Sequence, residues 1–392
     1  MALTMDVALV SCRDYSPAAL DAAIAQAAES GGFPDIRGKK ILIKPNVLNA
    51  SAPEKAVTTH PEFLRAVVRF LRRLGASEIR VGDSPAIHNP IAAAKASGLY
   101  AAAEEEGAEW VEFSPGSPRP APKAAKVKSF VLASALDDCD MVVNLPKLKT
   151  HRLTQYTGAV KNLFGLVPGL NKSGYHLRFP DRDAFGTMLV DLALSVGPCF
   201  TFMDAVVAME GEGPGNGKPY PLGFVLGSAD MAALDWVAAE CIGYDPRKIP
   251  YLREAFERNG REAEAAKDLE VGPEKPCKPR AGNFELIPYG NSGSSTIGAL
   301  HPSLKTLARM FTVDRPIFHP SLCIGCGACV RICPAKALQQ DKNRGSRIRI
   351  DDNACITCFC CHEVCPAAAI TIGKVPLRSR SASFDSGKRR GK

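Results

Sequence analysis

Short apolar runs alternate with segments of helical periodicity along the first two thirds of the chain. Ser16 and Pro17 are suited to the N-cap and first turn of a helix, and His60-Pro-Glu begins another helix that Gly75 closes. The predicted strands are residues 6–11, 40–45, 78–83, 109–113, 129–132, 140–146, 200–204 and 222–226. The other predicted helices are residues 89–107, 183–196, 230–242 and 248–258. Because short apolar strands alternate with helices, the pattern predicts an α/β fold, a mainly parallel sheet with helices on both faces.

Changes in composition divide the chain into four parts. Its 392 residues exceed what one hydrophobic core usually serves, which favours two domains. Pro, Gly, Ser and Lys accumulate after the α/β pattern ends, as in a linker or a segment that wraps over the surface. We therefore predict an α/β domain over 1–267, a linker or wrapping segment over 268–314, a small cysteine-rich domain over 315–373 and a basic, disordered tail over 374–392.

Charge and hydropathy argue against membrane-spanning and nucleic-acid-binding functions. Hydrophobic residues make up 46% and charged residues 23% of the chain, as in ordinary globular proteins. No apolar run approaches the roughly 20 residues of a bilayer span, and the start resembles no secretory signal, so we expect a cytoplasmic protein without membrane contact. Residues 374–392 carry a net charge of +6 out of the total +8. A solvated tail explains this charge, and we expect no nucleic-acid partner.

Nine of the 14 cysteines are concentrated between Cys323 and Cys365. The run Cys323-x2-Cys326-x2-Cys329-x3-Cys333-Pro334 returns 32 residues later as Cys355-x2-Cys358-x2-Cys361-x3-Cys365-Pro366. A four-iron cluster needs four thiolates, and three cysteines spaced in this way on a tight loop reach three of its irons. The fourth thiolate must come from elsewhere. Such clustering favours a metal site over a disulfide framework and indicates that the site is duplicated.

Over about residues 315–373 the chain resembles bacterial ferredoxins with two [4Fe–4S] clusters, which are small α+β proteins. In that family the last cysteine of each run ligates the other cluster. The resemblance implies two [4Fe–4S] clusters, one held by Cys323, Cys326, Cys329 and Cys365, the other by Cys355, Cys358, Cys361 and Cys333. Two zinc ribbons are the alternative, but the third cysteine of each run and the Cys-Pro ending disfavour zinc.

The two cysteine runs differ between their ligands. Gly325 and Gly327 let the first loop turn closely around sulfur, and Thr357 and Phe359 take those places in the second. The ninth cysteine, Cys360, corresponds to Ala328 and is expected to be an extra thiol beside a cluster. Packing is its simplest role, and catalysis or ligand exchange is the alternative.

In the α/β domain, polar residues concentrate at the carboxyl ends of the predicted strands, where ligands bind in such sheets. Four lysines are hard to bury without negative charge opposite them, so the sequence indicates a site for an anionic small molecule, a carboxylate or a phosphate. The alternative is that these lysines are solvated. The candidate ligand-binding residues are Lys44, Asn46, Asp83, Asn144, Lys149, Lys161 and Asn162, and the candidate catalytic residues are Lys147 and His151.

Other familiar motifs do not fit this chain. The loop Glu210-Gly-Glu-Gly-Pro-Gly-Asn-Gly217 suits a mobile lid, a metal site or an ordinary loop, and it does not follow the dinucleotide-binding pattern. No phosphate-binding loop and no nucleophile elbow appear. Neither NAD nor ATP is therefore supported by the sequence.

The runs Asn144-Leu-Pro-Lys-Leu-Lys-Thr-His151, Thr157-Gly-Ala-Val-Lys-Asn-Leu-Phe-Gly-Leu-Val-Pro168 and Met209-Glu-Gly-Glu-Gly-Pro214 resemble signatures of the DUF362 family. This family is a domain of unknown function, often fused to a C-terminal two-cluster ferredoxin. The resemblance implies that Lys147, Lys149, His151, Lys161 and Asn162 belong to the region that its members share. It supplies no reaction.

These observations predict an iron–sulfur electron-transfer protein or oxidoreductase. Its two clusters would pass electrons to a redox partner protein, or to an anionic substrate or cofactor that the α/β domain holds, with His151 delivering a proton. The alternative is a ligand-binding or assembly module whose clusters are structural or redox-sensing. Non-redox metal catalysis through Asp83, Asp204 and Glu210 is the weakest alternative, because carboxylate spacing alone rarely identifies a metal.

Overall fold

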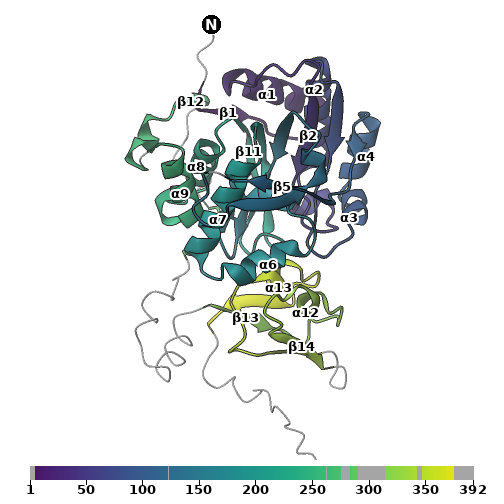
Figure 1. Cartoon of the computed structure of the whole chain (residues 1–392), viewed down its shortest axis with the longest axis vertical. Helices are drawn as coiled ribbons and strands as arrows, with labels where there is room; N and C mark the ends of the chain where they lie inside the picture. The colour runs from purple at the N-terminus through teal and green to yellow at the C-terminus, as the bar shows by residue number, and fades with distance from the viewer. Residues whose placement is uncertain are drawn as a thin grey trace, which may run out of the picture. The chain divides into compact units, whose positions relative to one another are not determined.

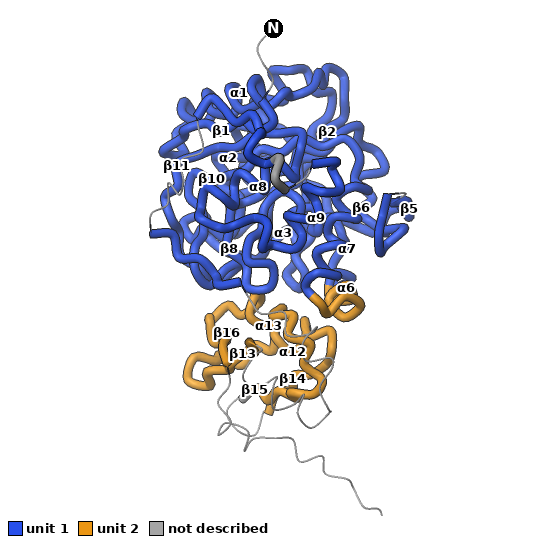
Figure 2. Tube along the Cα trace, turned by 90° about the vertical axis from the view of Figure 1, so that its left-hand side faces the viewer, with its two compact units in different colours: residues 1–172, 182–289 blue, residues 173–181, 290–392 orange. Residues whose placement is uncertain are grey.

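The computed structural model describes residues 5–121, 123–261, 263–274, 283–289, 314–341 and 347–374 of the chain. The chain divides into two compact units, coloured separately in Figure 2. We call residues 1–172 and 182–289 the α/β unit, and residues 173–181 and 290–392 the cysteine-rich unit. The predicted tail lies outside the described residues except for Lys374, and so do residues 275–282 and 290–313 of the predicted linker.

A ten-stranded mixed sheet forms the centre of the α/β unit (Figure 1). Its main path runs in the order β12-β1-β11-β10-β7-β2-β3-β4, and β8 pairs with β10 and β9. Only the β1–β11, β10–β11 and β8–β9 pairings of this sheet are antiparallel among the described strands, so the predicted mainly parallel sheet is confirmed. The strands are β1 (Val7–Ser11), β2 (Lys40–Pro45), β3 (Glu78–Val81), β4 (Glu109–Trp110), β7 (Met141–Leu145), β8 (Lys147–His151), β9 (Gln155–Thr157), β10 (Cys199–Glu210), β11 (Lys218–Ser228) and β12 (Val271–Pro273).

Helices cover both faces of the sheet, because alternate residues of each strand point to opposite faces and both sets are apolar. Ile41 and Ile43 of β2 pack in a core with helices α1 to α4, whereas Leu42 between them is buried on the other face. On that other face α8 contacts β1 and β11, and it packs against α5 and α9. The helices are α1 (Pro17–Ser30), α2 (Pro61–Arg73), α3 (Pro90–Ala96), α4 (Leu99–Glu105), α5 (Ala159–Asn162), α6 (Asn171–Arg178), α7 (Arg182–Ser195), α8 (Met231–Cys241) and α9 (Pro250–Arg258).

Several segments of the α/β unit differ from the sequence prediction. The helix expected over 89–107 is two helices, α3 and α4, because Gly98 takes a left-handed φ of 75° between them. Residues 147–151, expected as a loop, form the buried strand β8. The start of the expected linker contributes β12, which pairs parallel to β1 at the edge of the sheet. A separate hairpin joins β5 (Pro115–Pro120) to β6 (Ser129–Ala133).

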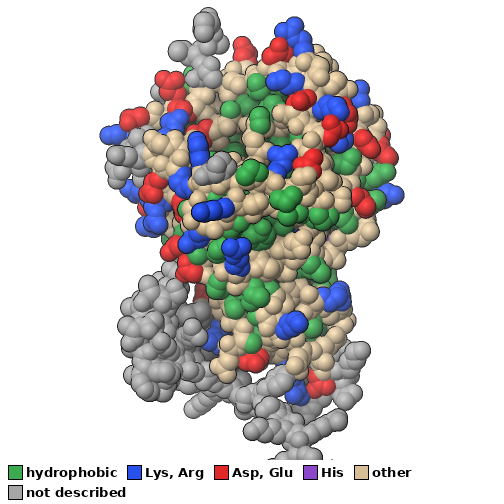
Figure 3. Space-filling view, viewed as in Figure 1, with side chains coloured by type: hydrophobic (Ala, Val, Ile, Leu, Met, Phe, Trp, Pro, Cys, Tyr) green, Lys and Arg blue, Asp and Glu red, His purple; other side chains and the backbone are tan. Residues whose placement is uncertain are grey.

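Basic and acidic side chains are interspersed over the face of the α/β unit that Figure 3 shows. Many of them pair locally, as Arg37 does with Asp35 at 2.9 Å and Lys40 with Asp138 at 2.9 Å. Exposed pairs of this kind contribute little to stability, because solvent screens the two charges. Ion pairs that matter more for stability lie in the interior of the unit.

The cysteine-rich unit is a duplicated fold whose elements repeat with the 32-residue shift of its cysteines. The first half contains β13 (Arg315–Phe318), α12 (Ala328–Ile332) and β14 (Leu338–Asp341), and the second contains β15 (Arg347–Ile350), α13 (Cys360–Glu363) and β16 (Ile370–Gly373). Each strand pairs with the other half, since β13 is antiparallel to β16 and β14 to β15. The two halves therefore interlock and bring distant cysteines together.

Candidate functional sites

Two cavities lie in the cysteine-rich unit, and each is lined by four of the eight repeated cysteines. The first is lined by Cys323, Cys326 and Cys329 of the first run and by Cys365 of the second. The second is lined by Cys355, Cys358 and Cys361 of the second run and by Cys333 of the first, together with Cys360. The structure thus brings together the same two sets of four that the ferredoxin resemblance implies. Each set has the donor chemistry of a [4Fe–4S] cluster.

The backbone around the two cavities has the same shape in both halves. Left-handed φ angles of 71° and 69° at Gly325 and Gly327 recur as 54° and 61° at Thr357 and Phe359. Side chains rarely adopt these angles without surrounding support, so the second loop is held in a strained shape by its packing. Phe359 supplies such packing, because its side chain is almost fully buried.

Backbone amides approach the fourth cysteine of each run in the same way. The N–H groups of Ala337 and Ala369 donate to the sulfur atoms of Cys333 and Cys365, both at 3.3 Å. Donation to cluster sulfur stabilises negative charge and is one means by which a protein tunes a cluster's potential. Burial raises the pKa of Cys329 and of Cys355 to about 11, so the positive charge of iron would be needed to hold these thiolates.

In the α/β unit, three of the candidate lysines are buried on strands β2 and β8, and two of these are paired with a carboxylate of the same chain. Lys44 at the end of β2 lies 2.9 Å from Asp83, and Lys147 at the start of β8 lies 2.9 Å from Asp204. Burial lowers the pKa of both lysines, and the partner carboxylates offset part of that effect. For these two lysines the opposing negative charge comes from the protein, which corrects the reason for expecting an anion beside them.

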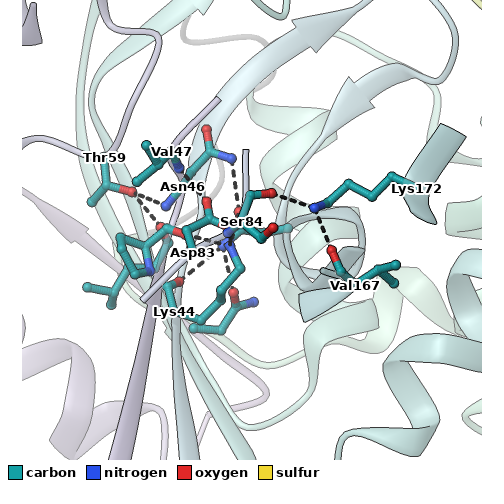
Figure 4. A network of polar contacts seen from close by, with 12 residues as sticks. Lys44, Asn46, Val47, Thr59, Asp83, Ser84, Val167 and Lys172 are labelled. Carbon is teal, nitrogen blue, oxygen red and sulfur yellow. Dashed lines mark hydrogen bonds and ion pairs between the residues drawn. The ribbon is translucent and has the colours of Figure 1, made fainter. Parts of the chain in front are cut away.

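Asp83 is the centre of a tightly packed network (Figure 4). Besides Lys44, its carboxylate accepts from the backbone N–H groups of Val47 at 2.6 Å and Ser84 at 2.7 Å. Lys172 enters from α6, and its ammonium donates to the carbonyl oxygens of Ser84 and Val167. Burial lowers the pKa of Lys172 to about 7, while Asp83 acts in the opposite direction. The negative charge of Asp83 therefore acts on two lysines, Lys44 and Lys172.

Asparagine side chains join the other candidate residues. Asn162 of α5 donates to the side chain of Asn144 at 2.8 Å and accepts from Asn46 at 3.0 Å. Lys149 donates to the side-chain oxygen of Asn46 and to the carbonyl oxygen of Val57, both at 2.7 Å. These residues therefore form one connected polar network beneath α5. Lys161, also on α5, is partly exposed.

The structure adds Tyr15 and His60 around Lys147. The hydroxyl of Tyr15 donates to Asp204 at 2.9 Å and accepts from Lys147 at 2.8 Å. Its ring stacks on that of His60 with centroids 3.6 Å apart, and the backbone N–H of His60 donates to Asp204. Burial lowers the pKa of His60. Tyr15 was not predicted from the sequence, although it follows the carboxyl end of the first strand, where site residues are expected in such sheets.

His151 occupies a different setting from the one expected of a proton donor. Its ring is fully buried at the end of β8, and Nδ1 accepts the backbone N–H groups of Leu153 at 3.1 Å and Thr154 at 3.4 Å. These contacts shape the turn between β8 and β9. Its predicted part in proton delivery stays a prediction.

Two interlocking halves that gather cysteines in sets of four define a two-cluster iron–sulfur protein, here joined to an α/β unit. Residues 41–240 match the model of DUF362, a domain of unknown function, and residues 315–366 match a 4Fe-4S dicluster domain. The chain belongs to the DUF362 family and carries two [4Fe–4S] clusters, which confirms the predicted fusion.

Two proteins that are related in sequence agree with this assignment. The "Thylakoid-associated protein sll1697" of Synechocystis is 34% identical over 268 residues, which are 67% of this chain and 82% of that protein. A ferredoxin of Pyrobaculum islandicum is 40% identical over 42 residues, 11% of this chain and 39% of the ferredoxin. The lactate racemase apoprotein from Thermoanaerobacterium thermosaccharolyticum superimposes with a TM-score of 0.37 at 12% identity, covering 58% of this chain and 55% of that one.

Within the described part of the chain, no helix combines the length and apolar character of a membrane span. The Synechocystis relative is named as thylakoid-associated, so the predicted cytoplasmic location of this chain stays a prediction.

Proposed function

We propose that this protein transfers single electrons through two [4Fe–4S] clusters, one in each cysteine-lined cavity. The ligands would be Cys323, Cys326, Cys329 and Cys365 for the first cluster and Cys355, Cys358, Cys361 and Cys333 for the second. The observation that carries this proposal is the gathering of three cysteines from one half and the last cysteine of the other around each cavity. Both proposed clusters would lie within one small interlocked unit, as in two-cluster ferredoxins.

Electrons would be exchanged with a redox partner at the first cluster. Cys326 is exposed, whereas every other cysteine that lines either cavity is partly or fully buried. Ile324 beside it is 69% exposed and lines the same cavity. An exposed ligand shortens the path from cluster to partner, and an apolar side chain at the contact loses little on desolvation.

The α/β unit would hold the anionic substrate or cofactor that receives the electrons. Lys44 and Lys172 share the single carboxylate of Asp83, and an anion bound beside them would favour the charged form of Lys172. Of the two predicted catalytic residues, Lys147 has the more suitable geometry for proton transfer, since it donates to the Tyr15 hydroxyl. His151 Nδ1 is occupied by two backbone amides.

Anaerobic purification tests the electron-transfer proposal directly. We expect iron and sulfide in the amounts of two [4Fe–4S] clusters, electron paramagnetic resonance signals after reduction with dithionite, and reoxidation by artificial acceptors such as viologen dyes. Zinc in place of iron, or clusters that cannot be reduced and reoxidised, would contradict it. Mass spectrometry of small molecules released from the same material identifies an anion bound to the α/β unit.

A structural role for the clusters is the second candidate, and the composition of the core favours it. Cys329 and Cys361 are buried in the core of the cysteine-rich unit, where they pack with Leu338 and Ile370. Replacing Cys326 or Cys355 by alanine distinguishes the candidates. Lost electron transfer with an intact fold favours the electron carrier, whereas loss of the fold of this unit favours a structural cluster.

A further inference from the structure

Cys360 is a fifth cysteine at a cavity for which four thiolates suffice. It begins α13, directly before Cys361, and lines the second cavity together with Cys333, Cys355 and Cys358. Its side chain is only 5% exposed. The equivalent position in the first half is Ala328, which begins α12 and lines the first cavity. The same backbone position therefore faces the cavity in both halves, once with a methyl group and once with a thiol.

The thiol of Cys360 lies in hydrogen-bond contact with the thiol of Cys358. The intervening Phe359 has a left-handed φ of 61°, which turns the chain back so that its two neighbours approach each other. Two sulfur atoms in such contact are close enough for the same iron corner to reach either of them. Cys361, the next residue, lies one helical step away and is the third cysteine of its run.

Packing alone does not account for this arrangement. Ala328 occupies the equivalent position of the first half and is only 6% exposed, so a methyl group is sufficient to fill this position. The thiol at position 360 adds a sulfur ligand beside another ligand, in a cavity already lined by sulfur. Sulfur of this kind binds iron as a thiolate.

We propose that Cys360 is an alternative ligand for the iron held by Cys358, so that the second cluster has two interchangeable thiolates at one corner. The inference rests on the proposed function, because it requires a [4Fe–4S] cluster in the second cavity. In the exchange, the bond from iron to the Cys358 sulfur breaks as the bond to the Cys360 sulfur forms. The proton leaves the Cys360 thiol and is taken up by the released Cys358 thiolate, so charge and oxidation state are unchanged.

Iron and sulfide content, with electron paramagnetic resonance, tests this exchange in three variants of the whole protein. We expect Cys358→Ala and Cys360→Ala each to keep both four-iron clusters. The double variant, Cys358→Ala with Cys360→Ala, should lose the second cluster or convert it to a three-iron form, and total iron should fall by as much as about half. The duplicated fold provides the matched control, since the position equivalent to Cys360 is Ala328 in the first half, and Cys326→Ala should lose the fourth iron of the first cluster.

Introducing a cysteine at the equivalent position of the first half gives a second test, in which a cluster should be restored rather than lost. Adding Ala328→Cys to the Cys326→Ala variant should restore four irons to the first cavity. If Cys358→Ala loses iron to the same extent as the double variant, Cys360 serves packing only and the inference fails. That failure is distinct from failure of the proposed function, for which the unaltered protein itself would lack two reducible clusters.

Discussion

At the scale of single residues, the α/β unit places positive charge inside a core where water cannot solvate it. Removing an ion from water costs several kcal/mol, and a close partner with further hydrogen bonds is needed to offset that cost. Lys44 has such a partner in Asp83, whose remaining oxygen lone pairs bind the amides of Val47 and Ser84. This arrangement leaves no room between the ion pair and the backbone of Gly165.

The closeness of Gly165 leads to the first prediction. A Cβ atom at this position would lie 2.6 Å from Lys44 Nζ and closer still to Asp83 Oδ1, so Gly165→Ala must push the pair apart. We expect the free energy of unfolding, measured with urea, to fall by roughly 2–4 kcal/mol. Gly174→Ala is the control, because nothing lies within 4 Å of its Cβ position and alanine suits the helix α6. Equal stability of the two variants would contradict this account of the ion pair.

The second prediction concerns Lys172 and pH. Burial lowers its pKa from 10.5 to about 7 in the folded chain. Between these values the unfolded chain binds a proton that the folded chain does not, so this residue makes the free energy of unfolding rise as the pH increases. We expect Lys172→Met to remove that part of the rise.

Denaturation of wild type and variant over this alkaline interval provides the measurement. Lys128→Met, at an exposed lysine, is the control and should follow the wild type. Parallel curves for Lys172→Met and the wild type would show that Lys172 does not titrate in this way. Inorganic phosphate that binds beside the protonated lysine should reduce the rise, because an anion favours the charged form.

At the scale of elements, strand pairing between the two halves of the cysteine-rich unit controls which cysteines meet. β13 pairs with β16 and β14 with β15, so the end of each run is carried to the cavity of the other. Neighbours in sequence, such as Cys329 and Cys333, thereby line different cavities. The proposed ligand sets follow from this pairing.

Pairs of substitutions test the crossing of the ligands. Cys333→Ala with Cys355→Ala removes two ligands of one cluster, so we expect about half of the iron to remain. Cys333→Ala with Cys323→Ala removes one ligand from each cluster, although both cysteines belong to the same run, and we expect both clusters to be damaged. Iron analysis of the anaerobic proteins distinguishes these outcomes. The reverse pattern would assign each cluster to a single run.

At the scale of the whole molecule, the two units differ in what holds them together. The α/β unit has a continuous core that joins helices α1 to α4 to the sheet, with Phe63, Phe200 and Phe202 among its buried members. In the cysteine-rich unit the cysteines are part of the core itself, since Cys329 and Cys361 are buried beside Leu338 and Ile370. A small domain whose core contains the metal ligands depends on its metal for stability.

Removing the iron should therefore unfold one unit and spare the other. We expect treatment with a chelator and an oxidant to abolish amide protection over residues 314–341 and 347–374, and to leave the strands of the large sheet protected. Hydrogen exchange followed by mass spectrometry makes this comparison within one sample. Equal loss of protection in both units would show that their stabilities are linked.

Sequence periodicity was sufficient for elements whose pattern is local. The strand over Lys40–Pro45 and the helix of α2 were both expected, because apolar spacing and end residues specify them. Strand β8 was missed because Lys147, Lys149 and His151 are polar residues, which are typical of exposed segments. In the folded protein β8 pairs with β10, and these side chains are buried. Tyr15 was missed for the same reason, because its partners Lys147 and Asp204 are far away in the chain.

By itself, the sequence determined the duplicated cysteine spacing, the alternation of strands and helices, and therefore the cofactors and the class of fold. These depend on covalent order and on contacts within a few residues. Only the tertiary structure decided that Asp83 and Asp204 pair with Lys44 and Lys147, and that Cys360 meets Cys358 across a left-handed turn. The physical reason is that most of these relations arise from pairing between distant strands, where sequence separation gives no measure of distance in space.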